Sequence, residues 1–272
     1  MKGNRFSTTI FWSLLVFLIG FSSCKSEFER IRTSGDGEII YKKALEFYEI
    51  EEYQKAQTLL ELAITSYRGK KEAEDIYYKY AYTYYYLERY ILAAYYFKNF
   101  SQTYGASKLR EESDFMAAYS NYRLSPTFRL DQSYTATAID ELQLFINTYP
   151  SSERVQECNN LIDEMRLKLE KKAFEEGKLY LDLRYYQSAM HSFENMLKDF
   201  PETINAAQVR YLIIKSNYML AENSILDKQP ERYQKTVEMA VEYIDRYAST
   251  SFAAEVMKIM EDSKKQLKLK QS

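Results

Sequence analysis

Small and hydrophobic residues recur at helical spacing along most of the chain, and the pattern is densest in one stretch. Residues 75–105 read DIYYKYAYTYYYLERYILAAYYFKNFSQTYG, where positions three and four residues apart form two amphipathic segments joined near residues 87–89. Ala81 and Ala93 are small enough to let two helix backbones approach closely. The large residues expected to fill the contact around them are Tyr77, Tyr80, Tyr84, Phe97 and Phe100. The stretch therefore predicts a pair of packed helices.

The same pattern recurs from residue 38 onward, with a small residue in the middle of each second helix. These marker residues are Ala56, Ala93, Ala138, Ala189 and Thr236, spaced 37, 45, 51 and 47 residues apart. In the third and fourth copies, Pro150 and Pro201 follow the marker by twelve residues. Such repetition is typical of tetratricopeptide repeats, in which each unit buries its apolar face against its neighbours. The sequence predicts an all-α fold, a superhelical solenoid of about five helix-turn-helix repeats.

The N-terminus has the features of a bacterial export signal. Lys2 and Arg5 precede a short apolar segment, residues 10–21, which is shorter than the roughly 20 residues needed to cross a bilayer. Two serines and then Cys24 follow, and this arrangement resembles a lipobox, although Phe21 stands where a leucine is usual. We therefore predict that Cys24 carries a lipid anchor. The alternative is an ordinary secretory signal with an incidental cysteine.

These features divide the chain into four predicted segments. Residues 1–23 are a lipoprotein signal peptide, residues 24–37 the lipidated cysteine and a polar tether, residues 38–262 the repeat solenoid, and residues 263–272 a basic C-terminal tail. Acyl chains on Cys24 would attach the protein to a membrane without a spanning helix. The lysines of the tail are expected to complement the dipole of the last helix.

The composition of the chain argues against several classes of function. The chain is 46% hydrophobic and 28% charged, with 7 glycines and 4 prolines, as expected of a folded helical protein. A net charge of −2 provides no basic face for nucleic acid, so no nucleic-acid partner is expected. Two cysteines and one histidine do not make a metal site, so neither a metal nor a cofactor is expected.

Candidate catalytic residues are few. His191 lies in the predicted fourth repeat with no acid, nucleophile or cleft indicated around it, and we expect a partly exposed packing or interface residue. Cys158 lies at helical spacing from apolar neighbours and is expected to be a small buried residue. No nucleophile elbow or phosphate loop occurs in the sequence. The chain is therefore not expected to be an enzyme.

Tyrosine is the unusual residue, with 27 in the chain and eleven within residues 75–105. In tetratricopeptide repeats one face of each first helix lines the concave surface. Alignment on the marker residues places an aromatic set there: Tyr41, Tyr48, Tyr78, Tyr82, Tyr85, Tyr86, Phe115, Tyr119 and Tyr122, together with Arg123. We predict that this set binds an extended peptide, since tyrosine provides both an apolar ring and a hydroxyl. The alternative is that these tyrosines only replace phenylalanine or leucine in packing.

Several stretches also resemble a known family. They are the Ser-Ser-Cys motif, YRGKKEAEDIYYKYAYTYYYLERYILAAYYFKNF, FMAAYSNYRLSP followed by LDQSYTATAIDELQLFINTYPSSE, and YYQSAMHSFENMLKDFPET. The chain resembles the BamD family, the tetratricopeptide-repeat lipoproteins of the β-barrel assembly machinery, and most of all its tyrosine-rich members in Bacteroidota. The likeness covers essentially the whole chain.

The resemblance implies a location and partners that the repeats alone do not. It implies a palmitate-bearing lipoprotein on the periplasmic side of the cell outer membrane, bound to a BamA-like barrel subunit and other components of the machinery. It also implies that the N-terminal repeats recognise the C-terminal signals of unfolded outer membrane proteins. The alternative function is a periplasmic tetratricopeptide adaptor in cell-envelope or peptidoglycan maintenance. A third hypothesis, carbohydrate capture, requires long insertions that this chain lacks.

Overall fold

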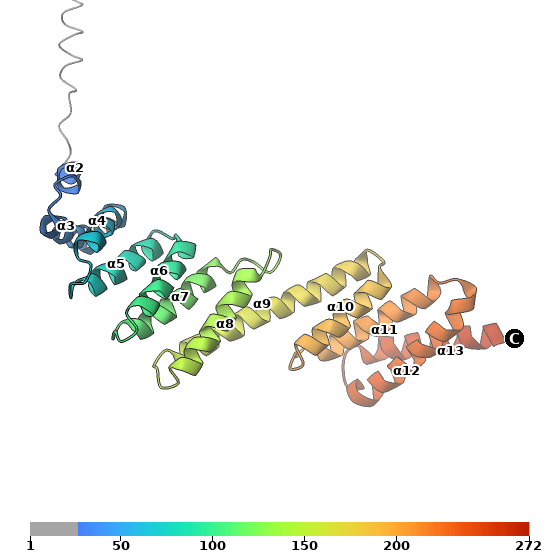
Figure 1. The fold of residues 1–272 in the computed structure, drawn as a ribbon. Coiled ribbons are helices and arrows are strands. Elements are labelled where there is room, and N and C mark those ends of the chain that lie inside the picture. Colours follow the sequence, from blue (N-terminus) through green and yellow to red (C-terminus); the bar gives the residue numbers. More distant parts are fainter. Residues whose placement is uncertain (1–26, 272) are drawn as a thin grey trace, which may run out of the picture. The chain divides into compact units, whose positions relative to one another are not determined.

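The computed structural model describes residues 27–271, and in that range helices joined by turns account for the fold, with no strand (Figure 1). The elements are α2 (Glu27–Arg32), α3 (Gly37–Glu49), α4 (Tyr53–Ser66), α5 (Ala73–Tyr86), α6 (Tyr90–Thr103), α7 (Arg110–Leu124), α8 (Ser133–Thr148), α9 (Val155–Asp182), α10 (Tyr186–Asp199), α11 (Ala206–Glu222), the 3₁₀ turn η1 (Leu226–Lys228), α12 (Gln229–Tyr247) and α13 (Ala253–Gln271). The chain divides into two compact units, one ending at Leu124 and one beginning at Ser125.

The first unit is a series of antiparallel helices in which each helix packs on the next. Helix α3 packs on α4, α4 on α5, α5 on α6 and α6 on α7. The largest fully buried side chains in this unit are Leu59, Leu60, Ile76, Phe97 and Phe100. Each pair buries an apolar stripe that neither helix could bury alone. The predicted all-α, helix-turn-helix architecture is confirmed.

The marker residues lie inside the helices α4, α6, α8, α10 and α12. Ala56, Ala93, Ala138, Ala189 and Thr236 are each 0% exposed. Thr236 is polar, but its hydroxyl is satisfied, because the side-chain amide of Asn217 donates to it at 2.9 Å. The fifth repeat, the weakest in sequence, is therefore built in the same way as the others.

The turn between the two helices of a pair recurs in three repeats. Glu51, Glu88 and Arg184 adopt φ angles of 61°, 56° and 62°, and each precedes a marker alanine by five residues. In each case the next amide bonds back to the preceding helix: Glu52 to Phe47 at 2.9 Å, Arg89 to Tyr84 at 2.9 Å and Tyr185 to Tyr180 at 2.8 Å. This is the helix-ending Schellman arrangement, in which glycine is the usual left-handed residue. These three repeats therefore share the same backbone turn as well as the same buried positions.

In the second unit the helix α9 explains the longest spacing between markers. It runs for 28 residues, and both α8 and α10 pack on it. Before α8 the loop of residues 125–132 is held to α9, where the Lys172 ammonium donates to the carbonyls of Phe128 at 3.2 Å and Leu130 at 3.1 Å. Helix α10 packs on α11, α11 on α12, and α13 on both α11 and α12.

Both ends of the described chain are helical. Residues 27–32, within the predicted tether, form α2, whose Ile31 is buried. The residues of the predicted basic tail continue α13, which ends at Gln271. The signal peptide and Cys24 lie outside the described residues. Among residues 27–271, none of the helices has the length and hydropathy required to cross a bilayer.

Close packing of α9 on α10 provides a test of the second unit. A Cβ atom at Gly177 would lie 2.6 Å from Cδ1 of Phe193, a fully buried ring. We expect Gly177→Ala to lower the free energy of unfolding by about 1–3 kcal/mol through overpacking, although alanine is the better helix former. Chemical denaturation monitored by circular dichroism measures the change.

The matched control is Gly105→Ala. At that position the nearest atom to an added Cβ is the Ser101 carbonyl oxygen at 3.9 Å, which is ordinary contact. This variant should stay within about 0.5 kcal/mol of the wild type. Equal stability of the two variants would contradict the packing described for Gly177.

Candidate peptide-binding surface

Tyrosines from α3, α5 and α7 of the first unit form one connected set of ring contacts. We call this set the tyrosine face: Tyr48, Tyr78, Tyr82, Tyr85, Tyr86, Tyr119 and Tyr122. Tyr48 of α3 contacts Tyr86 of α5 with ring centroids 6.2 Å apart. Tyr85 of α5 contacts Tyr119 of α7 at 6.2 Å. The structure thus brings together most of the residues predicted for peptide binding, all of them within the first unit.

Tyr82 is the fixed centre of the tyrosine face. Its ring packs edge-on against the buried Phe97 at 4.8 Å and lies beside Tyr86 at 5.6 Å. Its hydroxyl donates to a carboxylate oxygen of Glu112 on α7 at 3.0 Å. Burial raises the pKa of Tyr82 above its usual range, and the nearby tyrosine and glutamate add to that effect. Tyr82 is therefore a neutral hydrogen-bond donor that holds α5 against α7.

Tyr86 and Tyr85 are more available to a ligand. Tyr86 is 44% exposed, and its ring stacks on Tyr53 at 4.4 Å, which fixes its orientation. The half-buried Tyr85 accepts a hydrogen bond from the Arg123 guanidinium at 3.3 Å. The same guanidinium lies 4.7 Å from the ring centre of Tyr90. These groups present ring edges, hydroxyls and one exposed cation side by side.

Two residues of the predicted set do not belong to this surface. Phe115 is only 2% exposed and stacks on Tyr119 at 5.5 Å, so its place in an open binding site is corrected to the core. Tyr41 lies apart from the connected rings. Its ring contacts Tyr67 at 5.1 Å, and its hydroxyl donates to Asp75 at 3.0 Å.

Three contributors were not predicted. Tyr53 and Tyr90 are the first residues of α4 and α6, and alignment on the marker residues did not include them in the aromatic set. Glu112 accepts the hydrogen bond from Tyr82, 30 residues earlier in the chain. No sequence spacing identifies that pair, since it depends on how α5 and α7 lie against each other.

A second group of tyrosines packs α5 against α6, as predicted. Tyr80 is 3% exposed and Tyr84 is 8% exposed. Tyr84 stacks on Tyr96 of α6 at 4.7 Å, and the hydroxyls of Tyr80 and Tyr84 lie 2.9 Å apart. Helix α5 therefore uses one tyrosine-lined side for the core and another for the tyrosine face.

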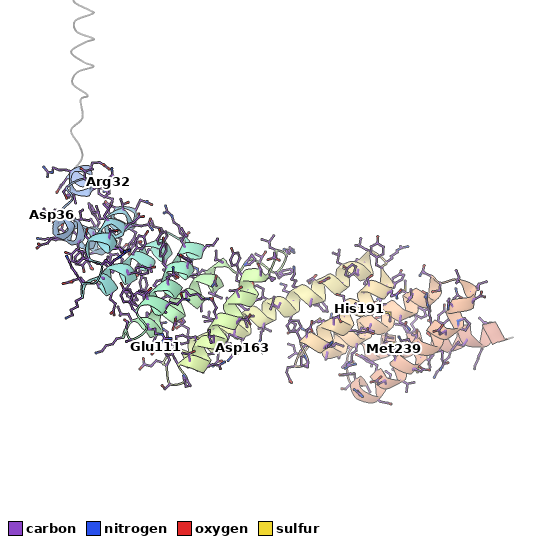
Figure 2. All side chains as sticks on the ribbon, in the orientation of Figure 1. Arg32, Asp36, Glu111, Asp163, His191 and Met239 are labelled. Carbon is purple, nitrogen blue, oxygen red and sulfur yellow. The ribbon has the colours of Figure 1, made fainter. Side chains whose placement is uncertain are left out.

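The remaining chemically active residues are not gathered into a site. His191 is exposed on α10 (Figure 2). Cys158 is fully buried, as predicted, and burial raises the pKa of its thiol to about 11, which keeps it protonated at neutral pH. Within residues 27–271 no group of histidine, cysteine and acidic side chains is arranged to hold a metal ion. The tyrosine face is the strongest candidate for function in the described chain.

Successive packed helices with buried residues at corresponding positions define a helical-repeat protein. Residues 34–229, from before α3 to the first residue of α12, match the family of outer membrane lipoproteins named YfiO. The chain belongs to this family.

Solved structures that match this chain include two TPR domains and RapI. The TPR2AB domain of yeast Sti1, solved in complex with pHSP90, is 12% identical, with 84% of this chain and 98% of that chain covered and a TM-score of 0.39. The TPR domain of P58(IPK) is 12% identical, with coverage of 100% and 72% and a TM-score of 0.39. Apo RapI is 13% identical, with coverage of 97% and 93% and a TM-score of 0.34. Curated protein sequences give no match. The family assignment therefore rests on the sequence match.

Ionisation of Tyr41 should lower the stability of the folded protein at alkaline pH. Burial, together with the Asp75 carboxylate, raises the pKa of Tyr41 from 10.0 to about 12. The folded state holds this proton more tightly than the unfolded state, so the stabilisation is complete below pH 10 and is lost as the pH rises toward 12. We expect the free energy of unfolding to fall more steeply over this window in the wild type than in Tyr41→Phe. Denaturant titrations at a series of pH values measure both slopes.

Asp75→Asn is a second variant for this measurement. It removes the charge beside Tyr41 but keeps an oxygen that accepts the hydrogen bond, so its slope should lie between those of the wild type and Tyr41→Phe. Coincident slopes for all three proteins would show that Tyr41 does not titrate as described.

Proposed function

We propose that the protein is a non-enzymatic component of the β-barrel assembly machinery that helps to recognise, fold and insert outer membrane β-barrel proteins. In this proposal Cys24 carries the lipid that anchors the chain on the periplasmic side of the outer membrane. The first unit receives unfolded barrel proteins, and the second unit docks on a BamA-like barrel subunit and other components. The observation that carries the proposal is the family match over residues 34–229.

The chemistry of the tyrosine face supports this choice of substrate. Barrel proteins end in aromatic, strand-like segments, in which alternate side chains point to opposite sides. Aromatic side chains of such a segment match the exposed ring of Tyr86, and its unpaired backbone groups match tyrosine hydroxyls and the Arg123 guanidinium. Tyrosine loses little side-chain entropy on binding because only two side-chain angles are fixed. A surface of this kind binds many related sequences without a catalytic step.

Depletion of the protein tests the proposed function. If the protein assists barrel assembly, its loss should lower the amounts of outer membrane β-barrel proteins while other lipoproteins remain at their normal level. Quantitative mass spectrometry of purified outer membranes measures both classes. Normal barrel-protein levels after depletion would overturn the proposal.

A pull-down separates the proposal from the alternative of an envelope adaptor. Co-purification of a BamA-like barrel subunit with the tagged protein is the expected result. Recovery of peptidoglycan-linked proteins without that subunit would favour the role in cell-envelope maintenance.

The tyrosine face has its own test. The double variant Tyr85→Ala with Tyr86→Ala removes two accessible rings and leaves the Tyr82 contacts with Phe97 and Glu112 in place. We expect it to bind a synthetic peptide from the C-terminus of a barrel protein about tenfold more weakly, as expected when central aromatic contacts are truncated. Fluorescence anisotropy of the labelled peptide measures the affinity.

Tyr95→Ala is the control for this experiment. Tyr95 is 58% exposed on α6, the second helix of the same pair, and it lies outside the tyrosine face. Its removal should leave the peptide affinity unchanged, and circular dichroism should show equal helix content in all the proteins. Loss of helix in the double variant would mean that Tyr85 and Tyr86 belong to the core.

A further inference from the structure

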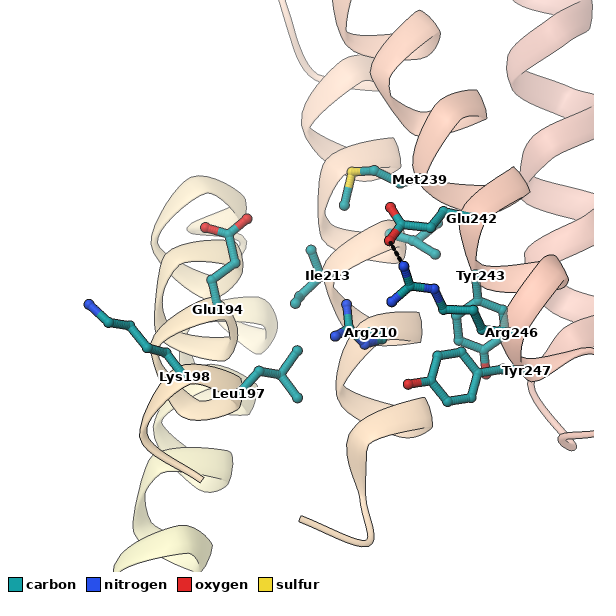
Figure 3. Close-up of a pocket in the computed structure, with 11 residues that line it drawn as sticks. Glu194, Leu197, Lys198, Arg210, Ile213, Met239, Glu242, Tyr243, Arg246 and Tyr247 are labelled. Carbon is teal, nitrogen blue, oxygen red and sulfur yellow. Dashed lines mark ion pairs between the residues drawn. The ribbon is translucent and has the colours of Figure 1, made fainter. Parts of the chain in front are cut away.

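The second unit contains a cavity that the proposed function does not use. It has a volume of about 300 Å³ and lies among α10, α11 and α12 (Figure 3). Leu197, Ile213 and Met239 provide an apolar lining, and Arg210, Arg246 and Tyr247 provide polar groups. Helix α12 lies beyond the family match except for its first residue, so the match does not describe this cavity.

Arg210 lines this cavity, and one donor of its guanidinium has no partner in the described chain. The Nε atom of its guanidinium is buried, and it has no hydrogen-bond partner among the described residues. Figure 3 shows Leu197 of α10 directed toward Arg210 from one side, with Arg246 and Tyr247 of α12 on the other. The Nε atom is closed off from solvent, so a ligand in the cavity would bond to the terminal Nη groups of Arg210.

The charges around the cavity leave one cation available. Glu242 forms an ion pair with Arg246 at 3.3 Å, one turn apart on α12, so these two charges offset each other (Figure 3). Glu194 and Lys198 lie one turn apart on α10, and the Lys198 side chain extends away from Arg210. Arg210 forms no ion pair with any other residue that the structure describes. The cavity therefore matches a ligand with a single negative charge.

We propose that this cavity binds a carboxylate carried on a short apolar body. A guanidinium binds a carboxylate through two parallel N–H···O bonds, which the two terminal Nη groups of Arg210 can donate. The lining of leucine, isoleucine and methionine accommodates an aliphatic chain. A volume of about 300 Å³ is at the lower end for ligand pockets, which suits a group the size of one amino acid. A phosphate dianion is disfavoured, since Glu194 and Glu242 also line the space.

Two sources provide this chemistry: a free short-chain acid and the C-terminal residue of a peptide. Calorimetric titration of the full chain in detergent, with N-acetyl-leucine, N-acetyl-leucinamide, hexanoate and inorganic phosphate, distinguishes the possibilities. Both carboxylates should bind, and the amide and phosphate should bind at least about tenfold more weakly because the paired charge is lost or mismatched. Tighter binding of hexanoate assigns the site to free acids, and tighter binding of N-acetyl-leucine assigns it to peptide ends.

Three variants make the test specific. Arg210→Met keeps an unbranched apolar stem but removes the guanidinium, and it should weaken carboxylate binding about tenfold. Arg210→Lys keeps the charge and should give an intermediate affinity, because a lysine cannot form the two parallel bonds. Lys235→Gln removes an exposed positive charge of α12 outside the cavity and should change nothing.

Several results would overturn the proposal. Equal affinity for the acid and the amide would show that the cavity binds its ligand through apolar contacts alone. Unchanged carboxylate binding by Arg210→Met, with circular dichroism showing a folded protein, would exclude the assigned role of Arg210. Absence of binding by both carboxylates at millimolar concentration would exclude the site. None of these results bears on peptide binding by the tyrosine face, which belongs to the other unit.

Discussion

Close approach of two helix backbones is the constraint on which the helix pairs within each unit depend. In the second helices of these pairs Ala56, Ala93, Ala189 and Thr236 are completely buried, and none has a side chain larger than that of threonine. A larger side chain there would push the pair apart and open the contact on which the rest of its packing is built. The aromatic and aliphatic neighbours then fill the space on both sides. This explains why the pattern survives in the fifth pair, where threonine replaces alanine.

Tyrosine is abundant in α5 because the two sides of this helix use it in different ways. On one side of α5, Tyr80 and Tyr84 fill the contact with α6 and pair their hydroxyls with each other. On the other, Tyr82 bonds to Glu112 of α7 while Tyr86 remains partly exposed. Phenylalanine would pack as well in the first setting, but it would leave the hydroxyl contacts of both settings unmade. The same residue type therefore stabilises the packing of α5 on α6 and provides rings and hydroxyl groups on the other side of α5.

Much of the fold could be predicted because its determinants are local. The marker residues and the core tyrosines recur at fixed helical spacing, so Ala93, Phe97 and Tyr80 were placed correctly from the sequence. The burial of Phe115 could not be predicted, since it depends on how far α7 turns toward its neighbours. The role of Glu112 was missed because a contact between residues 30 positions apart leaves no periodic signal.

The long helix α9 has a mechanical consequence for whatever binds the second unit. Its 28 residues span about 42 Å as one uninterrupted ladder of backbone hydrogen bonds. Helices α8 and α10 both pack on this rod, so neither can slide without breaking contacts along it. Bending it at one point would require breaking several bonds of the ladder together. A partner that touches both helices would therefore meet two surfaces at a fixed distance from each other. Its affinity would be higher because binding would not have to restrict a hinge motion, which costs conformational entropy.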